Sequence, residues 1–294
     1  MLSFCYVSIL LEKTACLFVS LHIDKQTLRK TIKWKKGRNG LIDIHTHILP
    51  GFDDGAKTEE DSLEMARAAV AEGITTVVAT PHHRNGVFDN ERESIEKWVD
   101  ILNELLEKEN VPLTVLPGQE TRINGEMIEE LENGTILPIN HSRHVFVELP
   151  FSSVPRYTGQ MLFDIQLQGY IPIIVHPERN QELVERPEKL YDFVKKGALT
   201  QLTTGSLIGE FGKDAQKFSR QIIEANLVHF VATDAHNTTT RRFNLSEAYN
   251  IIQKDFGSDY FYMYLENAEL MANDQNVNRP EPMQVKRKRF FGLL

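Results

Sequence analysis

Histidine, aspartate and glutamate residues stand directly after short apolar runs at several places in this 294-residue chain. The first run ends in His45-Thr46-His47. Side chains two residues apart point the same way on a strand, so both imidazoles can reach one metal ion. A lone buried histidine is more often a core residue than a ligand, so this pair alone leaves both interpretations open.

The same residue types follow six of the seven apolar runs that we interpret as strands. In chain order the ends carry His45-Thr46-His47 with Asp53-Asp54-Gly55, Thr80-Pro81-His82-His83-Arg84, Gln119-Glu120, Glu148, His176-Pro177-Glu178-Arg179, and Thr233-Asp234-Ala235-His236 with Arg241 and Arg242. The sixth run is followed only by Thr203, Thr204 and Ser206. Carboxylates packed together without cations would repel one another and lose their hydration. Two or more divalent cations would remove that cost, so the pattern predicts a multinuclear metal site.

The ligand types indicate which metal and which chemistry the site would support. Carboxylates roughly match imidazoles and no cysteine is among them, which suits Mn, Fe or Zn and disfavours a thiolate zinc site. Such a cluster lowers the pKa of a bridging water and binds phosphoryl oxygens as a Lewis acid. Arg179 and Arg241 could hold a phosphate bidentately, the alternative being surface salt bridges. His82 could protonate the leaving oxygen, or it makes a hydrogen bond to a ligand.

Other polar residues near these positions have less direct roles in this interpretation. Asp53, His83, Arg84 and Glu178 stand beside better candidates, and we expect them to support the site. The histidines outside the strand ends are expected to be structural or on the surface; they are His22, His141, His144 and His229.

The apolar runs are short, continuous and often β-branched, as expected of strands buried on both faces of a parallel sheet. They are Leu41–Ile44, Thr75–Ala79, Leu113–Leu116, His144–Val147, Ile171–Val175, Leu199–Thr203 and Leu227–Ala232. Helical patterns separate them, and the first begins at a capping box of Thr58 and Asp61 and stops at Gly73. This alternation predicts an α/β fold whose sheet is closed, or nearly closed, into a barrel. An open doubly wound sheet is the alternative, but no glycine-rich phosphate loop follows the first strand.

Composition excludes several classes of protein. The formal net charge of -8 disfavours nucleic acid or an acidic membrane as the main partner. Both cysteines, Cys5 and Cys16, lie near the start, so no disulfide framework holds the fold, and we expect a cytoplasmic protein. A cysteine-dependent phosphatase needs an arginine six positions after its cysteine, where this chain has Leu11 and His22.

The two ends of the chain differ from the middle. Residues 1–40 contain an apolar stretch, but Glu12 and Lys13 divide it into runs too short to span a membrane, so we expect no stable insertion. A weak reverse-oriented anchor is one alternative. We favour another: Lys36-Gly37-Arg38 can be encoded by a purine-rich ribosome-binding sequence, so the natural protein would start at Leu41. Residues 276–294 end in basic and aromatic residues and are predicted to be a flexible tail.

Together these motifs resemble the polymerase-and-histidinol-phosphatase (PHP) superfamily. The matching segments are Asp43-Ile44-His45-Thr46-His47, Asp53-Asp54-Gly55, Thr80-Pro81-His82-His83-Arg84, Gly118-Gln119-Glu120, Val147-Glu148, His176-Pro177-Glu178-Arg179-Asn180 and Ala232-Thr233-Asp234-Ala235-His236-Asn237. More narrowly, they are similar to the bacterial metal-dependent tyrosine-protein phosphatases of capsule and exopolysaccharide loci. The resemblance implies a phosphatase domain over residues 41–275. Neither end of the chain belongs to the shared pattern.

The resemblance also implies a fold, a cofactor and roles for individual residues. It implies a distorted seven-stranded (β/α) barrel of the PHP type, with the active site at the C-terminal ends of the strands. The site would hold three metal ions, usually Mn²⁺, with Fe, Zn or Mg as other possibilities. By motif position the ligands would be His45, His47, Asp54, Glu120, Glu148, His176, Asp234 and His236, and His82, Arg179 and Arg241 would be catalytic.

The implied function is hydrolysis of phosphotyrosine on bacterial tyrosine kinases and related proteins, which regulates capsular or exopolysaccharide synthesis. One alternative is a small-molecule phosphatase such as histidinol-phosphate phosphatase. Another is a non-catalytic PHP scaffold, which degenerate ligand positions would favour, whereas here every position is filled. A metal-dependent C–N hydrolase commonly uses a carboxylated lysine, and no lysine stands at a strand end.

Overall fold

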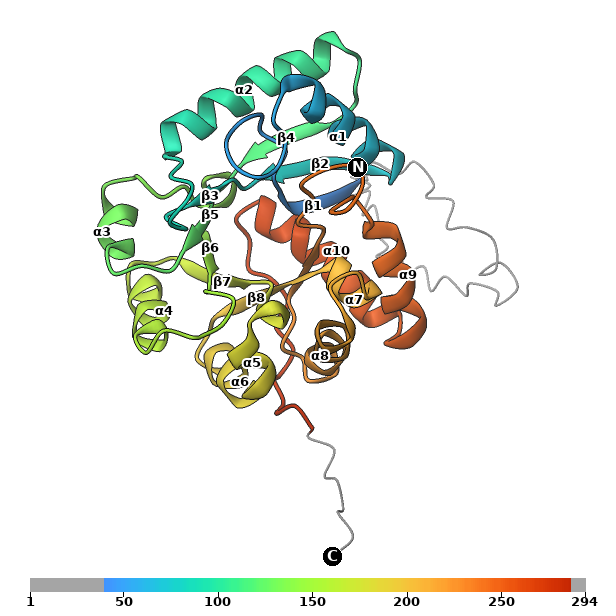
Figure 1. Cartoon of the computed structure of the whole chain (residues 1–294). Helices are drawn as coiled ribbons and strands as arrows, with labels where there is room; N and C mark the ends of the chain where they lie inside the picture. The colour runs from blue at the N-terminus through green and yellow to red at the C-terminus, as the bar shows by residue number, and fades with distance from the viewer. Residues whose placement is uncertain (1–39, 287–294) are drawn as a thin grey trace, which may run out of the picture. The chain divides into compact units, whose positions relative to one another are not determined.

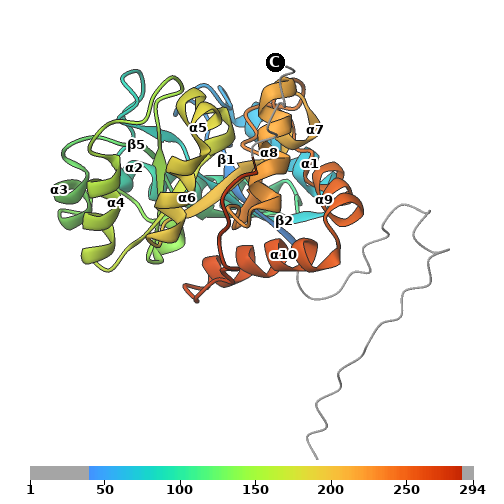
Figure 2. The same ribbon diagram turned by 90° about the horizontal axis from the view of Figure 1, so that it is seen from below.

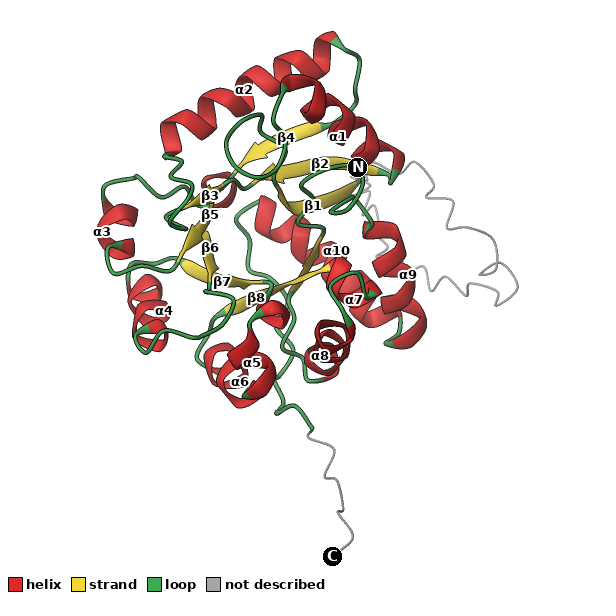
Figure 3. Cartoon of the chain, in the orientation of Figure 1, coloured by secondary structure: helices red, strands yellow, loops and turns green. Residues whose placement is uncertain are grey.

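Parallel strands connected by helices make up the chain over residues 40–286, which the computed structural model describes (Figures 1 and 3). The predictions made for residues 1–39, and for the basic end at 287–294, lie outside the described residues. The strands are β1 (Leu41–Thr46), β2 (Ile74–Ala79), β3 (His82–His83), β4 (Thr114–Pro117), β5 (Glu120–Arg122), β6 (His144–Glu148), β7 (Ile171–Val175), β8 (Leu199–Thr203) and β9 (Phe230–Ala232).

Helices follow most of the strands and cover the outside of the sheets (Figure 1). They are α1 (Glu59–Ala71), α2 (Arg92–Lys108), α3 (Met127–Glu132), α4 (Thr158–Leu167), α5 (Gln181–Glu185), α6 (Pro187–Lys195), α7 (Thr204–Ile208), α8 (Lys213–Glu224), α9 (Leu245–Asp255) and α10 (Ser258–Ala272), with 3-10 turns η2 (Ile139–His141) and η3 (Pro177–Arg179). The predicted capping box is present at α1: Thr58 accepts from the Asp61 N–H, and the Asp61 carboxylate accepts from the Thr58 N–H. In the part of the chain that the structure describes, no helix combines the length and hydropathy needed to cross a membrane.

The α/β fold with parallel strands is as predicted, but the nine strands of the described residues form two sheets in place of the distorted seven-stranded barrel that we predicted. One sheet has the order β1-β2-β4 and the other β3-β5-β6-β7-β8-β9. All seven predicted strands are present, and the two additional ones, β3 and β5, continue the paths of β2 and β4 after a break. Pro81 and Pro117 lie at that break, and neither has an N–H to donate to a neighbouring strand. The strands are therefore divided between two sheets at this point. β4 pairs with β2, whereas β5 pairs with β3 and β6.

The first and last strands approach each other on the opposite side. The Asp234 N–H donates to the His45 carbonyl at 2.9 Å, and the His47 N–H donates to the Ala235 carbonyl at 2.8 Å. The Asp43 carboxylate accepts from both the backbone N–H, at 3.0 Å, and the hydroxyl of Thr233. Because β1 is joined to the segment after β9, the C-terminal ends of strands from both sheets meet around one space.

A cluster of buried apolar side chains lies between the strands beneath this space. It includes Ile44, Phe146 and Phe230, together with Ala268 and Met271 from α10, which runs along the base in Figure 2. The Phe146 ring lies 5.2 Å from the ring of His45, centroid to centroid. The apolar floor therefore touches the polar strand ends directly, and it keeps water from reaching them from below.

Residues 276–286 pack against this domain, so the boundary that we predicted at residue 275 comes too early. The Val277 side chain is buried in the apolar cluster. The Asn278 N–H donates to the Asn267 side chain at 2.7 Å, and Asn267 donates back to the Asn278 carbonyl at 3.0 Å. Farther along, the Met283 N–H donates to the Ala225 carbonyl at 2.8 Å. The Asn267 amide also donates to the His229 carbonyl at 2.9 Å, so one buried side chain links this polar, proline-containing segment to the residue before β9.

We predict that a chain spanning residues 41–286 is as stable as the full chain, whereas one spanning 41–275 is less stable. The shorter chain loses the buried Val277 side chain and leaves the Asn267 oxygen buried without a donor, which costs about 1–3 kcal/mol for the unsatisfied group alone. Urea unfolding of both chains measures the difference. Equal urea midpoints for the two chains would show that residues 276–286 contribute nothing to the stability of the domain.

Candidate functional site

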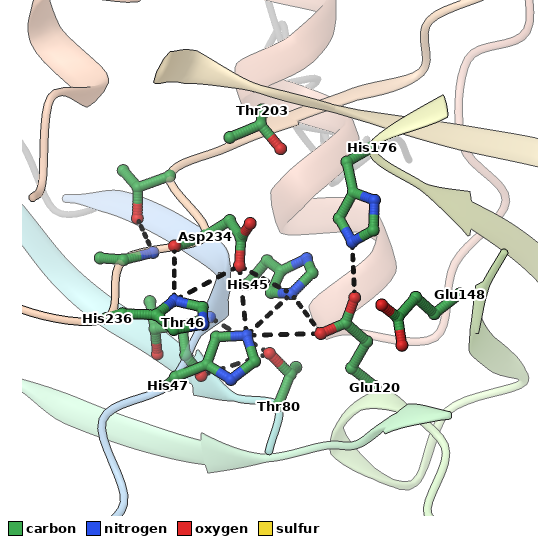
Figure 4. A network of polar contacts seen from close by, with 12 residues as sticks. His45, Thr46, His47, Thr80, Glu120, Glu148, His176, Thr203, Asp234 and His236 are labelled. Atoms are coloured by element: carbon green, nitrogen blue, oxygen red, sulfur yellow. Dashed lines mark hydrogen bonds and ion pairs between the residues drawn. The ribbon is translucent and has the colours of Figure 1, made fainter. Parts of the chain in front are cut away.

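The predicted site residues lie together at the C-terminal ends of the strands and in the loops after them. Figure 4 labels His45, His47, Glu120, Glu148, His176, Asp234 and His236. Each has at least one side-chain contact with another member; the set is His45, His47, Asp54, His82, Glu120, Glu148, His176, Arg179, Asp234, His236 and Arg241. They come from elements as far apart in sequence as β1 and the loop after β9. The proximity is a finding of the structure, and the role of each residue as ligand or catalyst stays a prediction.

Three overlapping groups of donors within this set could each hold a metal ion. Within a group the ligand atoms all lie within 4.8 Å of one another. The groups are His45, His47, Glu120 and Asp234; His47, Asp54, His82 and His236; and His82, Glu120 and Glu148. His47, His82 and Glu120 each belong to two groups, as bridging or adjoining ligands of a multinuclear centre would. His176 adjoins the third group, since its Nε2 atom lies 2.7 Å from a Glu120 oxygen.

Neighbouring side chains fix the orientation of the two imidazoles from β1. The Nδ1 atom of His45 lies 2.9 Å from the Gln201 side-chain oxygen, and Nδ1 of His47 lies 2.6 Å from an Asp53 oxygen. The two Nε2 atoms consequently face the centre, 3.3 Å apart. A hydrogen bond on one ring nitrogen sets which nitrogen is free to bind a cation, and it raises the basicity of the ring.

The loop after β1 is pressed closely against the strand that precedes it. Asp53 accepts from the N–H groups of Gly55 at 2.9 Å and His82 at 3.1 Å. A Cβ atom at Gly55 would lie 2.1 Å from the His47 carbonyl oxygen, so no other residue fits there. This close approach brings Asp54 over the centre, where its oxygen lies 3.3 Å from Nε2 of His236.

Two of the strand ends turn through left-handed backbone conformations. His176 has a φ of 34° and Asp234 a φ of 55°. This region is uncommon for residues other than glycine, and such strain occurs most often at functional sites. At both positions the turn directs the side chain from a strand end into the cluster, as Figure 4 shows.

The charges of the cluster compensate one another. Burial would lower the pKa of His82, but the charge of Glu120 and a hydrogen bond to Asp54 raise that pKa to about 10. Burial would raise the pKa of Glu120, but His82 and His45 hold it well below its usual range. Glu148 differs: burial and the charge of Glu120 raise its pKa. The protein without metal thus needs protons on histidines to offset its carboxylates, and cations would take over that role.

A second observation also indicates that the side chains of the cluster can bind cations. Several buried side-chain atoms of the cluster make no hydrogen bond in the structure: Glu120 Oε2, Asp234 Oδ1 and His236 Nε2. Their neighbours are other members of the cluster at ion-pair distance, such as His82 Nδ1 at 2.9 Å from Glu120 Oε2, and a cation can supply the bond that these atoms lack. Each of these residues belongs to one of the three donor groups, so the residues present can hold the predicted ions.

Two arginines border the cluster on one side. Nη2 of Arg179 lies 2.6 Å and Nη2 of Arg241 lies 2.7 Å from the same oxygen of Asp234. The Nε atoms of both arginines are buried and make no hydrogen bond. A guanidinium offers its donors in a planar fork that matches phosphate oxygens. Two unused N–H donors beside a metal-type cluster are therefore suited to bind an oxyanion.

Arg122 and Gln201 at the site were not predicted from the sequence, and Asp43 was named only as part of the first motif. Arg122 donates to both oxygens of Glu148, at 2.9 Å each, and so holds that carboxylate in place. Gln201 orients His45, and Asp43 ties β1 to Thr233. Arg122 follows Glu120 by two residues on one strand, and Gln201 is a polar residue inside an apolar strand. Both were signals that the sequence contained.

The residues expected to support the site vary in how close they lie. Asp53 contacts His47, and Glu178 accepts from Ser206 at 2.7 Å and from the Thr203 N–H at 3.1 Å, which anchors the turn that carries Arg179. His83 contacts Asp89, and Arg84 contacts Glu130, away from the centre. Of the histidines expected to be structural, His144 and His229 are buried and His141 is exposed; His22 lies outside the described residues.

Comparison with known proteins agrees with this geometry. The tyrosine-protein phosphatase YwqE of Bacillus subtilis (strain 168) is 52% identical over 253 residues, covering 86% of this chain and 100% of that protein. The tyrosine-protein phosphatase CpsB of Streptococcus agalactiae serotype III (strain NEM316) is 32% identical over 243 residues, covering 81% and 100%. A crystal structure reported with YwqE from B. subtilis and CpsB from Streptococcus pneumoniae, described as metal-dependent tyrosine phosphatases, is 53% identical with a TM-score of 0.82, covering 84% of this chain and 100% of that one. The model of the capsular polysaccharide synthesis family CpsB/CapC matches residues 41–273. This chain belongs to the CpsB/CapC family.

Proposed function

We propose that this protein is a metal-dependent tyrosine-protein phosphatase. The observation that carries the proposal is the pair of unused, buried Nε–H donors of Arg179 and Arg241 beside three overlapping metal-type donor groups. Such a site can bind a phosphate group between cations and guanidinium groups. The relatives named above are tyrosine-protein phosphatases, and this supports a phosphotyrosine substrate over a small-molecule substrate such as histidinol phosphate.

Three ions, Mn²⁺ in our proposal, would bind in the three donor groups. The predicted ligands supply every member of the three groups except His82, and His176 adjoins the third group through Glu120. His82 belongs to two groups, with contacts of 2.9 Å to Glu120 and 3.5 Å to Asp54. We therefore assign His82 as a ligand, a change from the proton donor that we predicted. A completely filled set of donors also disfavours a non-catalytic scaffold.

In this mechanism the residues of the chain bind and orient the phosphate. Cations in such a site supply a water of lowered pKa and polarise the phosphoryl oxygens. Arg179 and Arg241 donate to the non-bridging oxygens, and Asp234 holds both guanidinium groups in place through one carboxylate oxygen. The leaving group of phosphotyrosine is a phenolate with a pKa of about 10, far better than an alkoxide, so no dedicated proton donor is required. This agrees with His82 acting as a ligand.

The finer parts of the proposal concern the biological substrate. The family of capsular polysaccharide synthesis proteins suggests that the substrate is a phosphorylated bacterial tyrosine kinase or a related protein, and that hydrolysis regulates capsular or exopolysaccharide synthesis. The chain carries a formal net charge of -8, so a phosphorylated substrate must be attracted by the local charge of the arginines and cations. We place this reaction in the cytoplasm, where such a kinase would present its phosphotyrosines.

A phosphotyrosine peptide and histidinol phosphate, assayed before and after chelation, test the proposed function. Protein loaded with Mn²⁺ should release phosphate from the peptide much faster than from histidinol phosphate, and chelation should abolish both reactions. Asp234→Ala removes a ligand and the anchor of both arginines, so peptide turnover should fall at least about a hundredfold. Full activity after chelation, or a preference for histidinol phosphate, would refute the proposal.

The metal content of a His82→Asn protein tests the reassignment of that residue. Loss of a ligand should lower the number of bound ions from three to two, measured by atomic emission, and should lower turnover with it. His141→Asn is the matched control, since that imidazole is half exposed and lies outside the donor groups. A His82→Asn protein with all its ions and low turnover would instead support the proton-donor role.

Replacing Arg179 with lysine tests phosphate recognition. Lysine keeps the charge but loses the planar fork, so kcat/KM for the peptide should fall by a factor that corresponds to about 1–3 kcal/mol. The control is Arg242→Lys, because Arg242 contacts Glu210 and Glu247 rather than the cluster. Unchanged kinetics in Arg179→Lys would mean that this side chain serves only to hold Asp234.

A further inference from the structure

An exposed phenylalanine lies against the candidate site. Phe151 follows β6 and is 54% exposed. Its ring stacks on that of His176 at 6.2 Å with 15° between the planes, and the guanidinium carbon of Arg179 lies 5.7 Å from its centre. Of the exposed large apolar side chains among residues 40–286, this is the one with a ring contact to both a predicted ligand and a phosphate-binding arginine.

The loop that carries Phe151 is held in place by its backbone. The Asn180 side chain donates to the Pro150 carbonyl at 2.6 Å and to the Ser153 carbonyl at 3.0 Å, and the Gln181 N–H donates to the Phe151 carbonyl at 2.7 Å. The ring is therefore carried by a loop that hydrogen bonds hold in place, and it lies beside His176 and Arg179 of the site. Exposing an aromatic ring to water costs free energy that a bound apolar group would recover.

A second aromatic ring, that of Phe211, also lies against Arg179, and we call Phe151 and Phe211 together the aromatic wall. The ring of Phe211 lies 5.1 Å from the guanidinium carbon of Arg179 and packs on Gly205, where a Cβ atom would lie 2.7 Å from it. Arg179 is thus held between two rings, and both keep its planar group oriented. A groove of about 630 Å³ opens beside Phe151, Arg179 and Phe211, with Val184 and Ala215 farther along its lining. The groove is also lined by the polar residues Glu178, Gln181, Glu185 and Asp214, so its apolar part is the portion formed by the two rings, Val184 and Ala215. This apolar part adjoins the arginine that we assign to phosphate.

We infer that Phe151 binds the phenyl ring of the phosphotyrosine substrate and so makes the site selective for aryl over alkyl phosphate esters. The inference rests on the proposed function, because it takes Arg179 as a phosphate ligand. In an aryl phosphate the ring is bonded to the ester oxygen itself, so a phosphate held at Arg179 brings the ring to this wall. An alkyl phosphate has no aromatic face at that position and gains little from it.

Binding of two phosphonates, which the enzyme cannot hydrolyse, tests the inference. Phenylphosphonate and methylphosphonate share the same oxyanion and differ in the phenyl ring. Titration into the Mn²⁺-loaded protein measures their affinities, and Phe151→Ala should weaken phenylphosphonate roughly fivefold to tenfold, the size of one aromatic contact. Methylphosphonate should bind the variant as it binds the wild type. Phe163→Ala is the matched control, since Phe163 is 53% exposed on α4 and should affect neither ligand.

Each outcome separates the inference from the function on which it rests. Equal weakening of both phosphonates, or no change for either, overturns the role of Phe151 while leaving the phosphatase proposal in place. Failure of the wild-type protein to bind either phosphonate refutes the phosphate site, and the inference with it. Phe151→Leu guards against a folding defect: it keeps an apolar side chain on the loop, so it should retain the melting temperature while weakening phenylphosphonate selectively.

Discussion

Neutralisation of buried carboxylates is the constraint on which the rest of this structure depends. Glu120 and Asp234 are buried against His45 and His47, and Glu148 is buried against His82, which also contacts Glu120. Each carboxylate would be costly there without positive charge. Histidines, arginines and the proposed cations share that task. The arrangement is possible because parallel strands bring their C-terminal ends to one edge, so residues distant in sequence supply the opposing charges. The Asp43 carboxylate is also buried, but it is satisfied by hydrogen bonds from the backbone N–H and hydroxyl of Thr233 and not by positive charge.

The departure from a regular barrel serves this constraint. The strands break at Pro81 and Pro117, and the chain resumes as β3 and β5, where His82 pairs with Glu120 in register. Without the break, β2 and β4 would continue along the first sheet. With it, His82 and Glu120 lie side by side on neighbouring strands and belong to the same donor group. The division into two sheets and the close approach of these ligands thus have the same cause, which is the break after β2 and β4.

The sequence predicted what depends on local pattern and missed what depends on packing. Strand positions and strand ends were predictable because apolar runs and the residues after them are read along the chain. The split into two sheets was not, since the apolar runs end at Ala79 and Leu116 and nothing in the sequence shows that strands resume at His82 and Glu120. The order of residues 276–286 depends on Asn267, a buried partner whose position is known only after folding. The role of Gln201 likewise becomes evident only in the folded protein, where its side-chain oxygen lies beside Nδ1 of His45.

The left-handed conformations of His176 and Asp234 have a consequence for how this protein can change over evolutionary time. A glycine would relieve the backbone strain at either position, which is worth on the order of 1 kcal/mol each, yet it would delete the side chain that reaches the cluster. Selection for greater thermal tolerance therefore cannot use the two most obvious stabilising changes. The protein must gain stability elsewhere, in its helices and loops. The need for side chains in the cluster thus limits how much the strand ends themselves can be stabilised.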